Sequence, residues 1–412
     1  MIKSNGLGLK KLFEWSTFIF CIWYFMPAVN VAFQSTVFKL AFFACFMTGL
    51  VGYMMCNGFR INGVTLSILI YYLIFAIFFV FGIGDASAHI RVSFIFWGLG
   101  LMFFGVIDEK SKVSLGKKLL FIFVITCITS AIGVLLDNDA ARTIAHAAAD
   151  DAIQNSYKAK NIASIYLFQC IVCFIPPLVL ISKTKKAKIC CAIALVTILL
   201  ILLNASFTIS IIVYVFAILL SFCFNQNVAR GFAATLLLTV VVLLVFLNGS
   251  TVLSYVASII ENPRISERIY GLRDLVYNDV YDSDAGLRFE LYATSFKTFL
   301  ENPFGVGPYY SYNEFENGIG YHSKIFDDLA RYGVFAIAFY VVFFVGYYRA
   351  LKKEWEKIEA GKVAGVVVLT YILFLILNIG HRSGEESICM MFIMPALPSI
   401  ILDYRQKKQK KN

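Results

Sequence analysis

The chain has 412 residues, of which 59% are hydrophobic and 15% are charged, and its mean hydropathy is +0.76. Soluble globular proteins are nearer half apolar and a quarter charged, so this composition excludes a soluble domain and predicts an integral membrane protein. The net charge of +10 does not indicate a nucleic acid partner, because the Lys and Arg residues fall where membrane topology places them.

Apolar segments long enough to cross a bilayer recur along the chain. A spanning helix needs about 20 mainly apolar residues, and open sheet edges would leave backbone groups unpaired in lipid. The sequence therefore predicts an all-α bundle of about 12 transmembrane helices, at residues 12–33, 37–56, 64–84, 89–107, 119–136, 161–181, 189–203, 208–224, 231–249, 327–348, 363–379 and 388–402. The short seventh and eighth spans are alternatively one broken helix pair around residues 204–210.

These spans divide the chain into three parts: spans 1 to 9 (1–249), a large polar loop (250–326), and spans 10 to 12 with a basic tail (327–412). Lys and Arg accumulate in cytoplasmic loops. With the N-terminus inside, the cytoplasmic side has 23 Lys and Arg against 7 Asp and Glu, whereas the outer side has 13 against 19. Both termini are therefore expected in the cytoplasm, and the polar loop, which is the one stretch with room for a site, on the outer face.

A second outer loop, residues 137–160, has Arg142, His146 and Asp150 at a four-residue spacing, which would place all three on one face of a short helix. Such a face could contact a substrate or bind a metal. Charges on one side of an Ala-rich segment are more typical of a solvated face, and the hypothesis of a metal site is the weakest of the three.

The polar loop contains a predicted amphipathic helix at 284–300, with Asp284 as its N-cap. The step from Asn302 to Pro303 ends this helix, because proline disfavours helical geometry in the residue before it. Gly305 and Gly307 then indicate a tight turn. The chain next reaches the tenth span through the residues His322, Ser323, Asp327 and Asp328.

A histidine at the start of a helix is near the positive end of the helix dipole, which favours its neutral form and suits it to act as a base. His322 is the only histidine of the polar loop. It could equally be an ordinary exposed loop residue. Asp327 and Asp328 are more typical of stabilising carboxylates at a helix N-terminus than of catalysts.

The order of these motifs resembles the O-antigen ligase and polymerase superfamily. The matching residues are Arg288, then Asn302-Pro303-Phe304-Gly305-Val306-Gly307, then His322-Ser323, Asp328-Leu329 and Tyr332-Gly333. The layout of twelve spans with a large outer loop late in the chain extends the likeness to the whole length.

The resemblance implies a membrane glycosyltransferase with a GT-C-like fold that uses no nucleotide sugar. Such enzymes take a glycan from undecaprenyl diphosphate on the periplasmic face of the bacterial inner membrane and transfer it to an acceptor hydroxyl. In the polymerases, called Wzy, the acceptor is the next lipid-linked repeat unit, and in the ligases it is the lipid A core. The short His-Ser form and the DDLARYG stretch look more like a polymerase. The implied partners are the lipid-linked oligosaccharide as donor and acceptor, membrane lipids, a chain-length regulator and a flippase.

The resemblance also implies roles for individual residues. Arg288 would bind the diphosphate, because arginine offers a planar fork that stays protonated, and His322 would take the proton of the acceptor hydroxyl. No metal or other cofactor is expected. Lower-ranked candidates for substrate binding are Asn302, Gly305, Gly307, Ser323 and Asp328.

The chain departs from the family in the loop between the seventh and eighth spans. Many relatives have a Ser-Arg pair there that contacts the diphosphate, whereas this chain has Asn204-Ala205-Ser206-Phe207-Thr208. The sequence leaves four outer-side arginines that could replace the missing cation: Arg91, Arg142, Arg331 and Arg382.

Two simpler interpretations stay open beside this one. Arg288 could be a headgroup anchor of an amphipathic helix. The chain could also be a flippase for lipid-linked oligosaccharides, but carriers usually have repeated halves, short loops and charges inside the bundle, which this sequence lacks. The sequence therefore ranks a polymerase first, a ligase second and a flippase third.

Overall fold

The structure is a computed structural model that describes residues 2–83, 98–145, 150–206, 208–224, 240, 249–278, 284–308, 316–377 and 389–409. These residues are folded almost entirely into helices. They contain no β-strand, and only Phe59 and Val106 form an isolated antiparallel bridge. The predicted all-α fold is therefore confirmed.

The N-terminal part consists of long helices: α1 (Ile2–Phe25), α2 (Pro27–Ala32), α3 (Thr36–Asn57), α4 (Gly63–Val80) and α6 (Glu109–Leu136). The predicted first span is broken at Met26, because Pro27 can begin a helix but cannot continue one from the preceding turn. The predicted fourth span lies partly outside the described residues.

The middle part has shorter helices: α7 (Ala140–Ala145), α8 (Asp151–Ala159), α9 (Tyr166–Cys173), α10 (Ile175–Ile181), α11 (Lys185–Asn204) and α12 (Thr208–Cys223). The expectation of one helix face formed by Arg142, His146 and Asp150 is wrong. Asp150 has non-helical backbone angles and caps the separate helix α8, where its carboxylate accepts from the backbone N–H of Ala152. His146 lies outside the described residues.

The C-terminal part contains a helix at Gly249–Ile259, α14 (Pro263–Tyr277), α15 (Asp284–Glu301), the 3-10 turn η1 (Glu316–Gly318), α16 (Lys324–Tyr332), α17 (Val334–Glu356), α18 (Lys362–Leu377), the π-helical turn η2 (Cys389–Ile393) and α20 (Met394–Gln409). Helix α15 confirms the predicted amphipathic helix. The predicted bounds of the tenth span, 327–348, are wrong, because Gly333 has a φ of +59° and separates the short helix α16 from the long helix α17.

Five helices of the described residues are long and apolar enough to cross a membrane: α3, α4, α6, α11 and α17. This indicates a membrane protein. The full set of twelve spans, the GT-C-like architecture and the orientation stay predictions, and the predicted ninth span lies largely outside the described residues.

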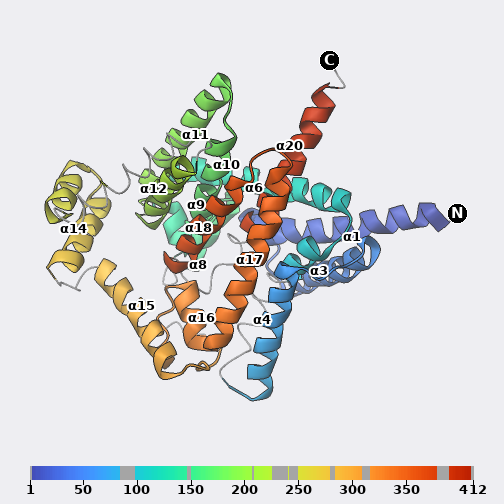
Figure 1. The fold of residues 1–412 in the computed structure, drawn as a ribbon, viewed down its shortest axis with the longest axis horizontal. Helices are drawn as coiled ribbons and strands as arrows, with labels where there is room; N and C mark the ends of the chain where they lie inside the picture. The colour runs from blue at the N-terminus through green and yellow to red at the C-terminus, as the bar shows by residue number, and fades with distance from the viewer. Residues whose placement is uncertain are drawn as a thin grey trace.

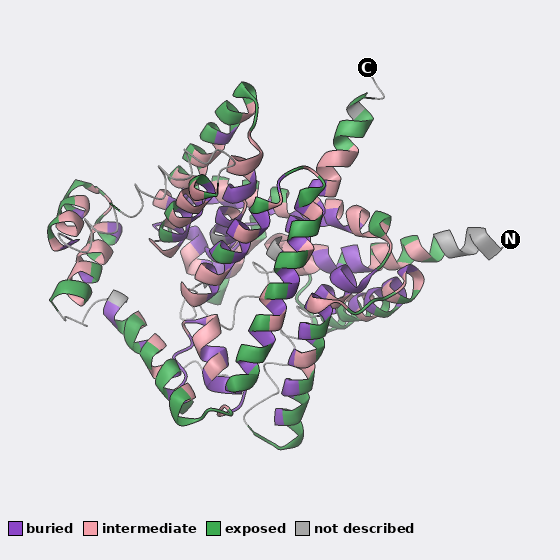
Figure 2. Ribbon diagram, in the orientation of Figure 1, coloured by how far each residue is buried: buried purple, intermediate pink, exposed green. Residues whose placement is uncertain are grey.

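Helix α17 is the centre of the bundle and packs against α4, α16, α18 and α20 (Figure 1). One face of α17 is buried and the other exposed (Figure 2), and Phe343, Tyr347 and Trp355 form part of the main apolar core. Helices α4 and α17 cross closely at two glycines, since a Cβ on Gly346 would lie 2.6 Å from the carbonyl carbon of Gly63. Helix α16 lies at the N-terminal end of α17, and the turn after Glu356 lies at its C-terminal end.

Candidate functional site

The start of α16 is joined to α15 by a buried hydrogen-bond network. Ser323 is the N-cap, and its hydroxyl accepts from the N–H of Phe326 at 3.3 Å. The Asp327 carboxylate accepts from the N–H of Ser323 at 3.2 Å and from the hydroxyl of Ser295 on α15 at 2.7 Å. The same Ser295 hydroxyl accepts from the N–H of Gly320 at 2.8 Å. One serine thus ties the segment before α16 to both helices.

A second buried network lies one residue further along α16. The Asp328 carboxylate accepts from the Lys324 ammonium at 2.6 Å, the Tyr340 hydroxyl at 2.7 Å and the Arg331 guanidinium at 3.3 Å. Arg331 is 0% exposed, and its guanidinium lies 5.3 Å from the centre of the Tyr321 ring. This geometry is that of an internal ion pair, so Arg331 is poorly placed to meet a diphosphate from solvent.

The two aspartates have opposite electrostatic settings. Burial raises the pKa of Asp327 to about 6, although Arg331 and the Ser295 hydroxyl act against this change. Burial would also raise the pKa of Asp328, but Lys324 and Arg331 together hold it below its usual value. Asp328 thus loses its charge only at a lower pH than Asp327 does.

The stretch from Asn302 to Gly307 packs backbone against backbone on the last turn of α16. The N–H groups of Val306 and Gly307 donate to the carbonyls of Ala330 and Arg331, at 3.0 and 2.9 Å. Gly305 has a φ of +88°, and a Cβ there would lie 2.2 Å from the Arg331 carbonyl oxygen. The glycines are therefore explained by the way this segment caps the carbonyl end of α16.

His322 is half-buried and held in one orientation by the backbone. Its Nδ1 lies 3.0 Å from the carbonyl oxygen of Gly320. A carbonyl can only accept, so the neutral imidazole must carry its proton on Nδ1, which places the lone pair on Nε2. This is the arrangement that a general base requires.

Arg288 lies on the face of α15 that packs toward this segment. Residues 288, 291, 295 and 298 share a helix face; Leu291, Ser295 and Thr298 are buried, and Arg288 is half-buried. A Cβ on Gly320 would lie 2.2 Å from the Leu291 carbonyl oxygen, so the chain leading to His322 runs directly over this face. Arg288 is one helical turn from Leu291. The predicted cation therefore lies on the same face of α15 as the segment that leads to the predicted base.

Two further arginines converge on the loop between α11 and α12, where the sequence lacks the family's Ser-Arg pair. Arg142, on α7, donates to the carbonyls of Ala205 and Ser206 at 3.3 and 2.6 Å. Arg268, on α14, donates to the same Ser206 carbonyl at 3.2 Å and to the Thr208 hydroxyl at 3.4 Å. Ser206 has a φ of +50°, which turns the loop tightly at this point.

These arginines also interact electrostatically. Burial, together with the positive charges of Arg268, Arg264 and Arg288, lowers the pKa of Arg142 to about 10, whereas Asp139 acts in the opposite direction. Asp139 forms an ion pair with Arg264. Arg142 is still protonated at neutral pH. Together with Arg268 and Arg288 it forms one cationic cluster, which can bind an anion with several oxygens.

The sequence-based candidates therefore fall into three groups. The first group contains Arg142 and Arg288, which belong to the cationic cluster, and His322, which follows the segment that runs over the α15 face. Ser323, Asp328 and Arg331 are buried in α16 or at its N-cap, and Asn302, Gly305 and Gly307 belong to the segment that packs on the last turn of α16. Arg91 and Arg382 lie outside the described residues.

Arg268 is the site residue that sequence reasoning missed. Its helix, α14, begins with Asn262, whose side chain accepts from the N–H of Ile265, followed by Pro263 in the first turn. An Asn N-cap followed by proline is a recognisable helix start, and it would have placed Arg264 and Arg268 on one face. Its contact with Ser206, 62 residues earlier in the chain, is not visible in the sequence.

Comparison with known families agrees with this region. A family model described as O-antigen ligase, Wzy_C, matches residues 189–341, from the start of α11 to the first half of α17. No curated protein matches the chain. The matched stretch includes Arg268, Arg288, the Asn302 to Gly307 segment and His322, and it is this part of the chain that is similar to the O-antigen ligase family.

Proposed function

We propose that this protein is a polymerase that joins undecaprenyl-diphosphate-linked oligosaccharide repeat units into a surface polysaccharide at the periplasmic face of the bacterial inner membrane. The similarity of residues 189–341 to the O-antigen ligase family supports a glycosyl-transferring enzyme of O-antigen processing. The observation that carries the proposal is the placement of His322, with its lone pair on Nε2, beside the α15 face that has Arg288.

In the proposed reaction, the acceptor hydroxyl oxygen bonds to the anomeric carbon of the donor sugar. The bond between that carbon and the diphosphate oxygen breaks, and undecaprenyl diphosphate leaves with the electron pair. The hydroxyl proton moves to Nε2 of His322. Arg288 and Arg142 bind the diphosphate oxygens, where their fixed positive charges stabilise the negative charge that grows on the leaving group.

Arg142 takes the place of the absent loop arginine in this proposal. Of the four candidates, Arg331 is buried in an ion pair with Asp328, whereas Arg142 lies at the loop itself and interacts with Arg288. The reaction is proposed to need no divalent metal, since the arginines supply the charge that a metal would otherwise provide. Activity is then expected to persist in excess EDTA.

The test is reconstitution of the purified protein with lipid-diphosphate-linked repeat units as the only substrate, with products resolved on a gel. A ladder is expected from the parent protein, and its loss from Arg288→Ala and His322→Ala. Lys297→Ala is the matched control, because Lys297 is on the exposed face of α15 and its one ion pair within the described residues is with Glu301 at 3.8 Å. A ladder that survives both variants would refute the site while leaving the polymerase in place.

Transfer to the lipid A core is the second candidate, because the matching family model is described as a ligase. If the parent protein gives no ladder, but forms one product when lipid A core is added, the protein is a ligase. If neither substrate set gives a product, both proposals fail, and transport of lipid-linked oligosaccharides becomes the hypothesis to test.

A further inference from the structure

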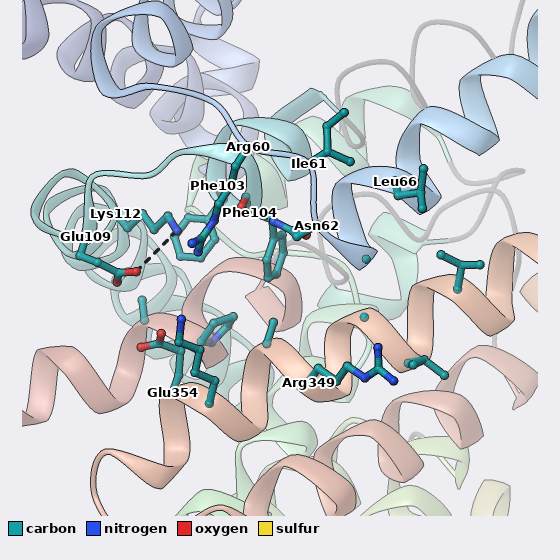
Figure 3. Close-up of a pocket in the computed structure, with 18 of the residues that line it drawn as sticks. Arg60, Ile61, Asn62, Leu66, Phe103, Phe104, Glu109, Lys112, Arg349 and Glu354 are labelled. Atoms are coloured by element: carbon teal, nitrogen blue, oxygen red, sulfur yellow. Dashed lines mark hydrogen bonds and ion pairs between the residues drawn. The ribbon is translucent and has the colours of Figure 1, made fainter.

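A cavity lies at the end of α17 opposite α16. It has a volume of about 710 Å³ and lies between α4, α6, α17 and α20 (Figure 3). From Val334, at the start of α17, to Arg349, which lines this cavity, the helix rises by about 22 Å. The cavity is therefore separate from the site that contains His322.

The cavity is formed by well-fixed backbone. On one side, the N–H of Arg60 donates to the carbonyl of Gly105, and the Asn62 side chain donates to the carbonyl of Phe104, both at 2.7 Å. At its base, the crossing of α4 and α17 at Gly63 and Gly346 brings the two backbones into contact. These contacts hold opposite walls at a fixed separation.

The polar part of the lining has an excess of positive charge. Four cations, Arg60, Lys112, Arg349 and Lys353, face two carboxylates, Glu109 and Glu354. Figure 3 shows Arg60 and Lys112 on one wall and Arg349 on the facing helix. The cavity therefore favours an anion.

Both carboxylates are engaged by lysines. Lys357, which does not line the cavity, lies 2.6 Å from Glu354 and 3.9 Å from Glu109, and Lys112 lies 3.9 Å from Glu109. In the described part of the chain, Arg60, Arg349 and Lys353 form no ion pair with a carboxylate. Their charges are thus available to a ligand.

The apolar part of the lining continues from these cations along the same helix stripe. Val341, Val345, Arg349 and Lys353 follow each other at four-residue steps on α17, so the stripe changes from aliphatic to cationic over about 6 Å per step. Val341 and Val345 are 57% and 45% exposed, on a helix apolar enough to cross a membrane. An aliphatic stripe that ends in cations matches the acyl chain and phosphate of a membrane lipid.

We propose that this cavity binds an anionic phospholipid. Its phosphate lies between Arg60, Arg349 and Lys353, and one acyl chain runs along Val345 and Val341. A soluble phosphate would satisfy the cations but leave the aliphatic stripe uncovered, which favours the lipid. Charge counting predicts that this end of α17 is cytoplasmic, and on that side anionic lipids attract basic residues near the membrane surface.

The test is native mass spectrometry of the purified full-length protein, titrated with phosphatidylglycerol or with phosphatidylcholine that has the same acyl chains. We expect the parent protein to bind phosphatidylglycerol at least tenfold more tightly. The triple variant Arg60→Gln/Arg349→Gln/Lys353→Gln is expected to lose this preference. The matched control, Lys185→Gln/Lys186→Gln/Lys188→Gln, removes the same charge from exposed residues outside the cavity and is expected to keep it.

Equal loss in the control would overturn the proposal, because the preference would then come from general surface charge. Absence of any preference in the parent, or its persistence in the cavity variant, would overturn it too. Thermal melting of each variant in detergent checks that the fold is retained.

A second pair of variants separates a lipid from a free phosphate. Val341→Ser/Val345→Ser is expected to weaken phosphatidylglycerol binding several-fold, whereas Leu69→Ser/Leu73→Ser, on exposed residues of α4 outside the cavity, is expected to leave it unchanged. If the valine variant binds like the parent and millimolar inorganic phosphate displaces the lipid, the site takes a phosphate ion and the lipid proposal is wrong.

Discussion

Replacing Ser295 with alanine is expected to destabilise the protein and to impair catalysis through His322. The buried hydroxyl donates to the Asp327 carboxylate at 2.7 Å and accepts from the Gly320 N–H at 2.8 Å. A hydrogen bond to a charged group contributes about 1.5–3 kcal/mol, and an orphaned buried donor costs about 1–3 kcal/mol. Since the two effects overlap, Ser295→Ala should lower the unfolding free energy by about 3 kcal/mol.

The effect on activity follows from the position of Gly320. Its N–H bonds to Ser295, and its carbonyl accepts from Nδ1 of His322. Loss of the Ser295 hydroxyl frees this segment, and a small displacement of a catalytic group can reduce the rate by about 100-fold. Turnover at saturating substrate should therefore fall more than KM changes.

The assay combines guanidinium unfolding in detergent, followed by tryptophan fluorescence, with the rate of ladder formation. Thr294→Ala is the matched control, because it removes a hydroxyl from the adjacent, half-buried position of α15. If Ser295→Ala matches this control within about 0.5 kcal/mol, the ordinary range for surface substitutions, the buried network does not hold the segment. Unchanged turnover would refute the link to His322.

Three further predictions concern the framework around α16. Gly305→Ala should lower the melting temperature more than Gly82→Ala does. Both glycines have a positive φ, but a Cβ at Gly305 would lie 2.2 Å from a backbone oxygen, whereas a Cβ at Gly82 has nothing within 4 Å. Equal losses of melting temperature would show that only backbone strain matters. Burial raises the pKa of Asp327 from 3.8 to about 6, so the folded protein binds this proton more tightly than the unfolded chain. The contribution of this proton to stability is full below pH 4 and is lost as pH rises through 6. The stability of Asp327→Asn relative to the parent should therefore increase over that interval and then level off. A difference in stability between the two proteins that does not change with pH would contradict the raised pKa. Tyr340→Phe removes a 2.7 Å hydrogen bond to the charged Asp328 and should lower the unfolding free energy by about 2 kcal/mol, measured by the same denaturation, with a change below about 0.5 kcal/mol counting against the bond.

Several features of the site could be predicted because their signals are local. The apolar spacing and the Asn302-Pro303 step predicted the helix that became α15, whose bounds differ from the prediction by one residue. The dipole argument correctly treated Asp327 as a carboxylate at a helix start. These inferences needed only neighbouring residues.

The division between α16 and α17 depends instead on a distant contact. Gly333 has a φ of +59°, and a Cβ there would lie 2.0 Å from the carbonyl oxygen of Pro303. The helix breaks where the segment after α15 crosses it, and this crossing joins parts of the chain 30 residues apart. Residues 334–348 are an apolar run that conceals the break, because hydropathy depends only on neighbouring residues and does not report a contact with a distant segment.

The choice among the arginines was likewise beyond the sequence. The spacing of Asp328 and Arg331 is compatible with an ion pair on one helix, but it does not tell whether that pair faces solvent or the core. The structure buries Arg331 completely. A buried arginine that is paired in this way supports the shape of the site, and the charge for a ligand must come from elsewhere.

That charge has a distinctive arrangement in the cationic cluster. Arg142 and Arg268 both donate to the neutral Ser206 carbonyl, so these contacts fix their positions without cancelling their charges. Burial is the largest cause of the lowered pKa of Arg142, and repulsion from its neighbours, Arg288 included, adds to it. Folding therefore holds like charges together at a cost, and a bound diphosphate would remove that cost. An anion should stabilise this region more than an uncharged sugar does, and this differential binding is what a site for a diphosphate leaving group requires.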